Sequence, residues 1–195
     1  MRLLVATTNA GKLREIRDLL AGLSIELVTL ADLPRVTEPD ETGATFEQNA
    51  RLKALYYAAH AGLPTVAEDS GLVVDAMDGE PGVLSARFLG AGATYPQRFA
   101  EIERRLTARP DAPRSARFVC ALAFVRDGTV MFETTQTVEG EIADRPRGDG
   151  GFGYDPIFWF PPYAKTLAEV TQDEKIRIAH RGKAFRAFAD WLREA

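Results

Sequence analysis

The first third of the chain alternates between short apolar runs and amphipathic segments. Residues 3–6 and 25–30 are apolar enough for short strands, and residues 64–68 predict a third strand. Between the first two, apolar residues recur at the spacing of one helical face. This stripe consists of Leu13, Ile16, Leu19, Leu20 and Leu23. Strands that alternate with helices are typical of parallel sheets, so this part predicts a βαβαβ core.

Two further helices are predicted by local patterns. Thr45 followed by Gln48 is a capping-box pattern and predicts a helix over residues 45–61. The chain ends in an amphipathic helix after Gly182. Its apolar face consists of Phe185, Phe188, Ala189 and Leu192.

The middle of the chain predicts a long antiparallel hairpin. A helix over residues 95–108 precedes two β-rich segments, 117–126 and 129–140. Asp127-Gly128 joins them, and this dipeptide is a strong signal for a two-residue hairpin turn. The expected fold class is therefore α/β, with a mixed central sheet that the hairpin extends and helices on both sides. We expect one domain spanning residues 1–195.

Composition sets limits on the partners. The 195 residues suit one domain or two small lobes that share a sheet. The net charge of −4 gives no broad basic face for duplex nucleic acid, so a bound anion needs a local cationic pocket. Cys120 is the one cysteine, which excludes a disulfide framework and a cysteine-built metal site. Its apolar neighbours predict a buried, inert thiol.

No segment suggests membrane insertion or export. No apolar run approaches the roughly 18 residues of a membrane span. The apolar start of the chain is too short for a signal peptide, so the expected location is the cytosol.

The polar segment after the first strand is a candidate anion site. A helix that begins there offers backbone N–H groups and a favourable dipole to an anion. The segment consists of Thr7, Thr8, Asn9, Ala10, Gly11 and Lys12. It is not a Walker A loop, because Ala6 and Leu13 stand where that motif needs Gly and Ser/Thr. The alternative is an ordinary polar turn with an exposed lysine.

Two charged residues are candidates in and just before the second predicted helix. Glu41 precedes it, as a partner of the helix dipole or as a metal ligand. Lys53 falls on the same helical face as Phe46 and Ala50. A lysine on such a face either extends past the apolar residues to solvent or points at a buried anion, and both alternatives stay open.

Two adjacent acids, Glu68 and Asp69, follow the third predicted strand. Burying them without partners would be costly. At the carboxyl end of a parallel strand they would point into the crevice where open α/β sheets bind ligands. There they could hold Mg²⁺ or act as a general base. The alternative is a polar exit from the strand.

A glycine-rich segment, residues 148–153, matches G-x-G-x-x-G. It is not a Rossmann fingerprint, because Pro156 follows where a helix should run. Phe152 and Tyr154 suit stacking on a flat ring, and Asp155 can accept from ring N–H groups. The alternative is a surface loop with packed aromatic residues.

The last candidates are His180 and Arg181, five residues beyond Lys175. With only two histidines, a histidine-cluster metal site is excluded. A lone histidine such as His180 is more often a structural residue, and Arg181 can read a carbonyl or phosphate with its planar donors. The apolar stretch 156–163 suits either an interface or the core.

Seven segments occur together in one order. They are Thr7-Thr8-Asn9-x-x-Lys12, Glu41-Thr42-Gly43 with Phe46 and Asn49-Ala50, Lys53, Asp69-Ser70-Gly71-Leu72, Pro81-Gly82 with Ser85-Ala86-Arg87, Phe152-Gly153-Tyr154-Asp155-Pro156, and Lys175 with His180-Arg181-Gly182. This set closely resembles the inosine/xanthosine triphosphate pyrophosphatases, which remove deaminated purine nucleotides. The resemblance covers about Leu3 to Leu192. Glu68 stands where the family commonly has Asp, and Phe88 where Tyr is common.

The resemblance implies roles for these residues. Thr7 to Lys12 would cradle the triphosphate, with Lys53 also near phosphate. Asp69 would be the proton acceptor and a Mg²⁺ ligand, with Glu41 assisting at the metal. The nucleotide and its base would be held by Ser70, Phe152, Gly153, Tyr154, Asp155, Lys175, His180 and Arg181. The resemblance also implies two lobes with a cleft between them, and a homodimer.

The implied activity is Mg²⁺-dependent hydrolysis of ITP, dITP and XTP to the nucleoside monophosphate and pyrophosphate. The expected partner is a purine nucleoside triphosphate, with no nucleic acid and no membrane. Two alternatives stay open: a non-catalytic purine nucleotide sensor, and a pyrophosphatase for modified pyrimidine triphosphates. A single-stranded nucleic-acid binder is disfavoured by the acidic charge.

Overall fold

The computed structural model describes residues 1–194, which form two compact units. Unit 1 comprises residues 1–69, 120–136 and 180–194, and unit 2 comprises residues 70–119 and 137–179. Among these residues, no helix has the length and hydropathy needed to cross a membrane.

Unit 1 contains the predicted βαβαβ core. Its elements are β1 (Arg2–Val5), α1 (Ala10–Leu20), β2 (Glu26–Thr29), α2 (Phe46–Ala61), the first half of β3 (Thr65–Val74) and α5 (His180–Glu194). β1 pairs in parallel with β2 on one side and with β3 on the other. The parallel core predicted from the hydrophobic pattern is therefore confirmed.

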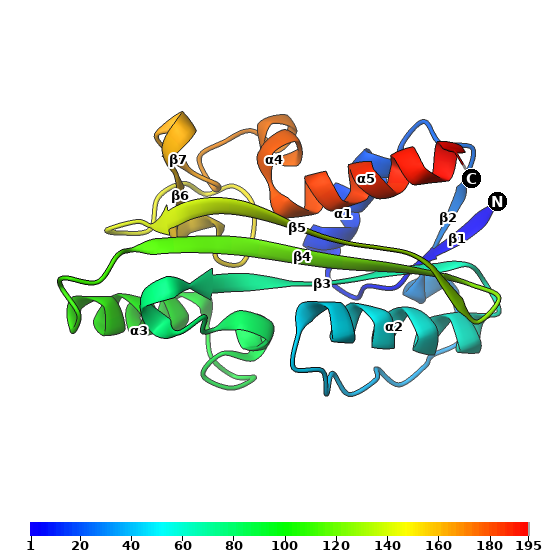
Figure 1. Cartoon of the computed structure of the whole chain (residues 1–195), viewed down its shortest axis with the longest axis horizontal. Helices are drawn as coiled ribbons and strands as arrows, with labels where there is room; N and C mark the ends of the chain where they lie inside the picture. The colour runs from blue at the N-terminus through cyan, green and yellow to red at the C-terminus, as the bar shows by residue number, and fades with distance from the viewer. Residues whose placement is uncertain (195) are drawn as a thin grey trace. The chain divides into compact units, whose positions relative to one another are not determined.

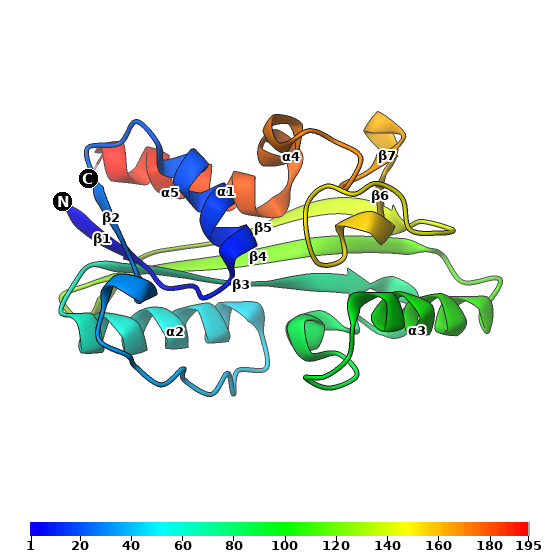
Figure 2. The same cartoon turned by 180° about the vertical axis from the view of Figure 1, so that it is seen from behind.

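Helices cover both faces of the strands in unit 1. α1 packs against α5 on one face, and α2 lies on the other (Figures 1 and 2). The core under α1 and α5 includes Leu3 of β1, Ile16 of α1, and Phe185 and Phe188 of α5. Burying side chains of this size contributes about 1.5–3 kcal/mol each. The apolar stripes seen in the sequence are therefore the core-facing sides of these helices.

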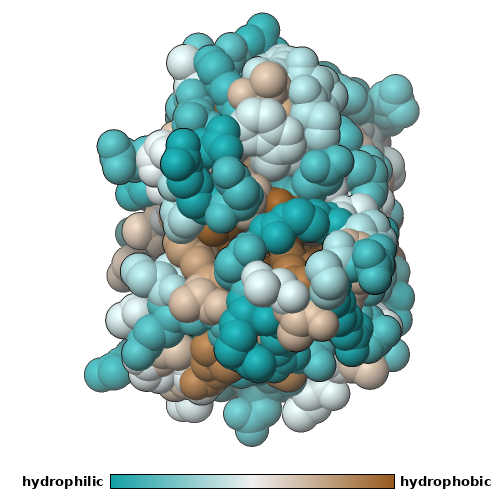
Figure 3. Space-filling model, turned by 90° about the vertical axis from the view of Figure 1, so that its left-hand side faces the viewer, coloured by the Kyte–Doolittle hydropathy of each residue, from teal (hydrophilic) through white to brown (hydrophobic). Residues whose placement is uncertain are grey.

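Unit 2 has its own core. Its elements are the second half of β3, α3 (Tyr95–Thr107), β6 (Phe158–Phe160), β7 (Lys165–Thr166) and α4 (Gln172–Ile178). Leu72, Ile102, Phe158 and Leu167 are fully buried together there. Of the apolar stretch 156–163, Ile157 and Phe158 belong to this core and Phe160 packs against it, whereas residues 161–163 are exposed. The face of the molecule in Figure 3 is mostly hydrophilic, with apolar residues in small areas between polar ones.

The strands of residues 1–194 form one seven-stranded sheet in the order β2-β1-β3-β4-β5-β6-β7. β4 (Ser115–Arg126) and β5 (Thr129–Ile142) are joined at Asp127-Gly128, as predicted. Both turn residues have positive φ angles, 51° and 74°, which is the geometry of a tight primed turn. The β5–β6 and β6–β7 pairs are antiparallel, so the mixed α/β class is confirmed. A cleft between lobes stays a prediction.

The structure corrects two predicted boundaries. The third strand does not end at Glu68 but continues to Val74. Glu68 and Asp69 remain in extended backbone because ion pairs satisfy their buried charges. The last helix begins at His180, two residues before Gly182. The loop 148–153 leads into a short turn of helix at Asp155–Ile157, which supports its exclusion as a Rossmann fingerprint.

Candidate active site

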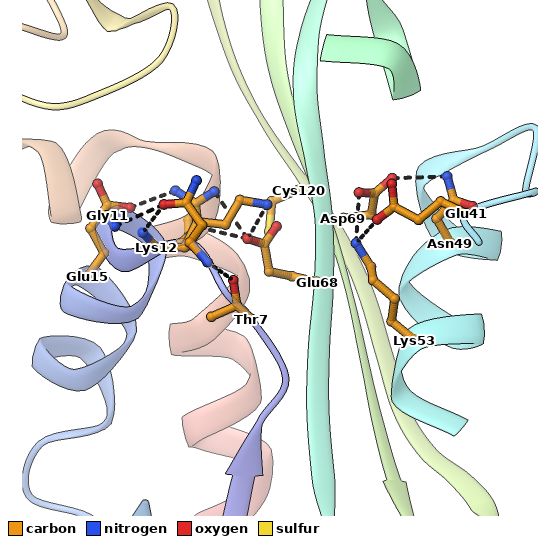
Figure 4. Close-up of polar contacts among 12 residues, drawn as sticks. Thr7, Gly11, Lys12, Glu15, Glu41, Asn49, Lys53, Glu68, Asp69 and Cys120 are labelled. Carbon is orange, nitrogen blue, oxygen red and sulfur yellow. Dashed lines mark hydrogen bonds and ion pairs between the residues drawn. The ribbon is translucent and has the colours of Figure 1, made fainter. Parts of the chain in front are cut away.

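Glu68 and Asp69 lie on opposite faces of β3. Figure 4 shows Glu68 pointing toward α1 and Asp69 pointing toward α2. Successive side chains of a strand alternate between its two faces, so an uninterrupted strand must separate this pair. The expectation that both acids enter one crevice at the end of a strand is wrong, because the strand does not end there.

The Asp69 cluster consists of Glu41, Asn49, Lys53 and Asp69. The Lys53 ammonium lies 2.6 Å from Glu41 Oε1 and 3.0 Å from Asp69 Oδ1. The Asn49 amide donates from Nδ2 to Asp69 Oδ2 at 3.2 Å. Asn49 and Lys53 are one turn apart on α2, so they reach the same carboxylate from one helix face. Lys53 therefore points at two carboxylates, of which Asp69 is buried and Glu41 half-buried, and does not extend to solvent.

Local sequence explains how α2 presents these residues. The Thr45 hydroxyl accepts from the Gln48 N–H at 3.3 Å and begins the helix. The Gln48 side-chain oxygen accepts a hydrogen bond from the Ala44 N–H. A capping box would use the N–H of Thr45, one residue later. Starting the helix at this point sets which face carries Asn49 and Lys53.

Burial and charge act in opposite directions in the Asp69 cluster. Burial raises the pKa of the Asp69 carboxyl, Lys53 opposes that rise, and Glu41 adds to it, so the pKa is above its ordinary value. Burial alone would lower the pKa of Lys53, but Asp69 and Glu41 together raise it. Lys53 thus stays charged while Asp69 becomes a better proton acceptor than an exposed aspartate.

The Glu68 cluster, on the α1 face, consists of Lys12, Glu15, Glu68 and Arg181. Glu68 binds Lys12 at 2.9 Å and Arg181 at 3.2 Å, and Arg181 binds Glu15 at 2.6 Å. Burial alone would raise the pKa of Glu68, but Arg181 and Lys12 outweigh it and hold that pKa well below its usual range. The cluster therefore pairs two buried carboxylates with two cations.

Cys120 is buried beside this cluster, as the sequence predicts. Its thiol lies 3.6 Å from Glu68 Oε2. Burial raises the pKa of Cys120 well above its ordinary value, so the thiol stays protonated and inert.

The segment Thr7 to Lys12 is positioned by its own cap. Asn9 Oδ1 accepts from the N–H groups of Gly11 and Lys12 at 2.9 and 3.1 Å, and Thr7 Oγ1 accepts from the Asn9 N–H. The N–H groups of Gly11 and Lys12 are thus bonded within the segment, and its binding of an anion stays a prediction. Asparagine is a preferred N-cap residue, and its side chain satisfies these donors.

His180 begins α5 in unit 1 and is buried, whereas unit 2 holds the candidates from Ser70 and from residues 152–155 and 175. Lys175 is 3% exposed, pairs with Asp155 Oδ2 at 2.6 Å and lies 4.5 Å from the ring centre of Phe152. The Phe152 N–H donates to the same Asp155 oxygen at 2.7 Å. Tyr154 lies in the core of unit 2, where its hydroxyl donates to the Ser85 carbonyl, so it is not an open stacking surface.

The structure thus gathers many of the predicted site residues into three groups. The Asp69 cluster holds the predicted proton acceptor and metal ligand, and the Glu68 cluster holds Lys12 and Arg181. Asp155, Lys175 and Phe152 form the third group, and Ser70 lies in the unit 2 part of β3. The sequence analysis missed Glu15, although its position three residues after Lys12 places both on one face of a helix.

Two carboxylates of the Asp69 cluster fit a divalent cation. Mg²⁺ prefers oxygen ligands and is usually bound by one or two carboxylates together with substrate phosphates. Glu41 and Asp69 supply such oxygens and already share one cation, Lys53. Within residues 1–194, no group of three or more His, Cys, Asp or Glu side chains could hold a metal. Further ligands would therefore come from substrate and water.

Comparison with known proteins identifies the family. Residues 3–191 match the Ham1 family. The chain belongs to the Ham1 family. A dITP/XTP pyrophosphatase of Exiguobacterium sp. (strain ATCC BAA-1283 / AT1b) is 45% identical over 95% of this chain and 94% of its own length. The dITP/XTP pyrophosphatase of Shigella flexneri is 44% identical over 98% of both chains.

A solved structure agrees with this assignment to the Ham1 family. The solved structure of a HAM1 protein from Coxiella burnetii superposes on this chain with a TM-score of 0.90 and 39% sequence identity. The match covers 100% of both chains. The resemblance seen in the seven sequence segments is therefore confirmed at the level of the Ham1 family and its fold.

Proposed function

We propose that this chain hydrolyses deaminated purine nucleoside triphosphates, ITP, dITP and XTP, to the nucleoside monophosphate and pyrophosphate with Mg²⁺. Membership of the Ham1 family supports this proposal, as do the names of its relatives. The observation that carries it is the Lys53 ammonium bound to both Glu41 and Asp69. Two carboxylates that converge on the ammonium of a half-buried lysine bring together the charges that phosphate chemistry uses.

Asp69 is the proposed proton acceptor. A water oriented by its carboxylate gives up a proton to it and forms a bond from oxygen to the α-phosphorus. The bond from the α-phosphorus to the bridging oxygen breaks, and pyrophosphate leaves with that electron pair. Asp69 is buried and both of its carboxylate oxygens are held by donors of α2, so the carboxylate is oriented for this role.

The cations compensate the charge of the phosphates. Mg²⁺ held by Glu41 and Asp69 would neutralise phosphate oxygens. Lys53 and Lys12 add positive charge, each as a compact ammonium suited to single phosphate oxygens. We propose that the segment from Thr7 to Gly11 also contacts the triphosphate. Phosphoryl chemistry requires positive charge placed around the phosphates in this way, since its catalysis is mostly positioning and electrostatic stabilisation.

Base selection would use the 6-oxo group and the N1–H of hypoxanthine and xanthine. Adenine presents a 6-amino donor, so a donor of the protein would meet another donor and be left unpaired. Sites of this kind discriminate strongly. Contacts of the nucleoside with Ser70, His180 and Arg181 stay predictions, as do those with Phe152, Gly153, Tyr154, Asp155 and Lys175.

The test is a hydrolysis panel with purified protein. Pyrophosphate release is measured with ITP, dITP, XTP, ATP, GTP, dUTP and a methylated pyrimidine triphosphate, with Mg²⁺ and with a chelator. We expect rapid release from the deaminated purines and none after chelation. ITP binding without turnover would indicate a sensor, and preference for the modified pyrimidine would indicate the other alternative. Either result would overturn the proposal.

Two further features complete the proposal. We infer a cytosolic site of action, because free nucleoside triphosphates are found there. We also propose a homodimer, which light scattering tests directly: a mass of one chain at micromolar concentration would contradict it.

A further inference from the structure

We propose that Asn49 is a positioning residue that fixes the orientation of the Asp69 carboxylate. Asn49 is 0% exposed and lies in the first turn of α2. Its amide makes two hydrogen bonds in different directions: Nδ2 donates to Asp69 Oδ2 at 3.2 Å, and Oδ1 accepts from the Gly43 N–H at 2.8 Å. The proposal rests on the proposed function, in which Asp69 accepts a proton.

Gly43 determines which end of the amide faces Asp69. A backbone N–H is only a donor, so the oxygen of the Asn49 amide must turn toward it. The nitrogen is then left facing the carboxylate, where it donates. A flipped amide would set two donors against each other at Gly43 and two acceptors against each other at Asp69. The loop before α2 therefore fixes the amide, and the amide fixes the carboxylate.

The close approach of Gly43 depends on its lack of a side chain. A Cβ at this position would lie 2.6 Å from Asn49 Oδ1 and 2.8 Å from Gln48 Cβ. Either contact would push the amide or the loop away. Gly43 is thus part of the same arrangement, which links the loop that carries Glu41 to Asp69 through one buried side chain.

Both oxygens of Asp69 receive a donor from α2. Asn49 binds Oδ2 and Lys53 binds Oδ1. Two donors one helical turn apart hold the plane of the carboxylate, whereas a single ion pair would leave it free to rotate. A misplacement of about 1 Å in such a site can cost about 100-fold in rate. Asn49 therefore acts on the reaction through Asp69, without contact with the substrate.

The neighbouring residue Gln48 provides a matched control. Gln48 is exposed, and its Oε1 accepts from the Ala44 N–H at 2.7 Å. It therefore supports the same loop by the same kind of bond, but it does not reach Asp69. Replacing Gln48 by Ala removes a bond to the loop and leaves the carboxylate held.

The experiment is a double-mutant cycle with ITP and Mg²⁺. Asn49→Ala should lower kcat about tenfold or more with little change in KM, and Gln48→Ala should leave kcat near wild type. In an Asp69→Asn background, Asn49→Ala should cause no further loss, because its effect acts through Asp69. An equal loss in both backgrounds would show a merely structural role and overturn the proposal. If wild type does not hydrolyse ITP, the proposed function fails instead.

Two further measurements keep the test decisive. If Asn49→Ala does not fold, as judged by circular dichroism, Gly43→Ala perturbs the amide from the other side and should give a loss of kcat that also vanishes with Asp69→Asn. Independently of turnover, the Nδ2 protons of Asn49 should exchange slowly by NMR in wild type and faster in Asp69→Ala. Exchange as fast as a free amide in wild type would overturn the proposal.

Discussion

Glu68 and Asp69 are consecutive residues of β3, and their carboxylates bind lysines on opposite faces of that strand. Glu68 lies 2.9 Å from Lys12 of α1, and Asp69 lies 3.0 Å from Lys53 of α2 (Figure 4). One strand thus anchors two separate ion clusters in unit 1. The Asp69 cluster carries the proposed proton acceptor, and the Glu68 cluster ties α1, β3 and α5 together around Lys12, which we propose also meets phosphate.

Replacing Asp69 by Asn removes the proposed proton acceptor while the shape of the side chain is kept. We expect kcat for ITP to fall about 100-fold or more. Pyrophosphate release under saturating ITP and Mg²⁺ measures the change. Asp127→Asn is the control, because it makes the same substitution in an exposed turn that accepts asparagine. Near-normal turnover in Asp69→Asn would remove this residue from the mechanism.

Replacing Lys53 by Ala leaves Glu41 and Asp69 without the ammonium that both of them bind. We expect kcat/KM for ITP to fall about tenfold or more, since a phosphate-neutralising cation is lost from the site. Arg51→Ala tests a change of charge on the same helix, because Arg51 pairs with Glu133 near the surface. If Lys53→Ala and Arg51→Ala have equally small effects, Lys53 has no role in turnover.

Replacing Glu68 by Gln should destabilise the fold. The substitution leaves buried Arg181 and Lys12 with one carboxylate fewer, and breaking a buried pair in this way costs about 3–5 kcal/mol. Urea unfolding at pH 7 measures the difference. Glu139→Gln breaks an exposed pair with Arg117 and should cost no more than about 1 kcal/mol. Equal costs for the two substitutions would contradict this interpretation of the Glu68 cluster.

The stability lost in Glu68→Gln should depend on pH. The pKa of Glu68 is lowered in the folded state from an ordinary value of 4.5, so its ionised form stabilises the fold above that pH. As the pH falls below this ordinary value, the stabilisation by ionised Glu68 is lost at about 1.4 kcal/mol per pH unit. The stability difference between wild type and Glu68→Gln should therefore narrow below pH 4.5. A constant difference between pH 7 and pH 3 would rule out this linkage.

Replacing Gly151 by Ala should disturb Asp155. Gly151 has a φ of +67°, and a Cβ there would collide with Asp155 Oδ2, which binds Lys175. Gly62→Ala is the matched control, because Gly62 has a φ of +61° with open space around it. Backbone strain alone costs about 1–2 kcal/mol. In thermal unfolding, Gly151→Ala should lower Tm more than Gly62→Ala does. An equal fall in Tm for the two variants would exclude the collision with Asp155.

The sequence by itself determined most of the local structure. The hydrophobic spacing placed α1 and the parallel strands, Thr45 placed the start of α2, and Asp127-Gly128 placed the hairpin turn. Each of these depends on interactions among residues close together in the chain. The ordered motifs likewise indicated Lys53 and Asp69, because they could be recognised without knowing their neighbours in space.

Only the tertiary structure decided how the charged residues are partnered. Glu-Asp-Ser-Gly resembles the end of a strand, and it stays extended only because cations from distant segments neutralise its acids. Glu15 and Arg181 are 166 positions apart, and Asn49 and Asp69 are 20 apart. Local patterns carry no information about such pairs. A buried charge is stable only where folding brings its partner within a few ångströms, so the partner is set by the packing of the elements.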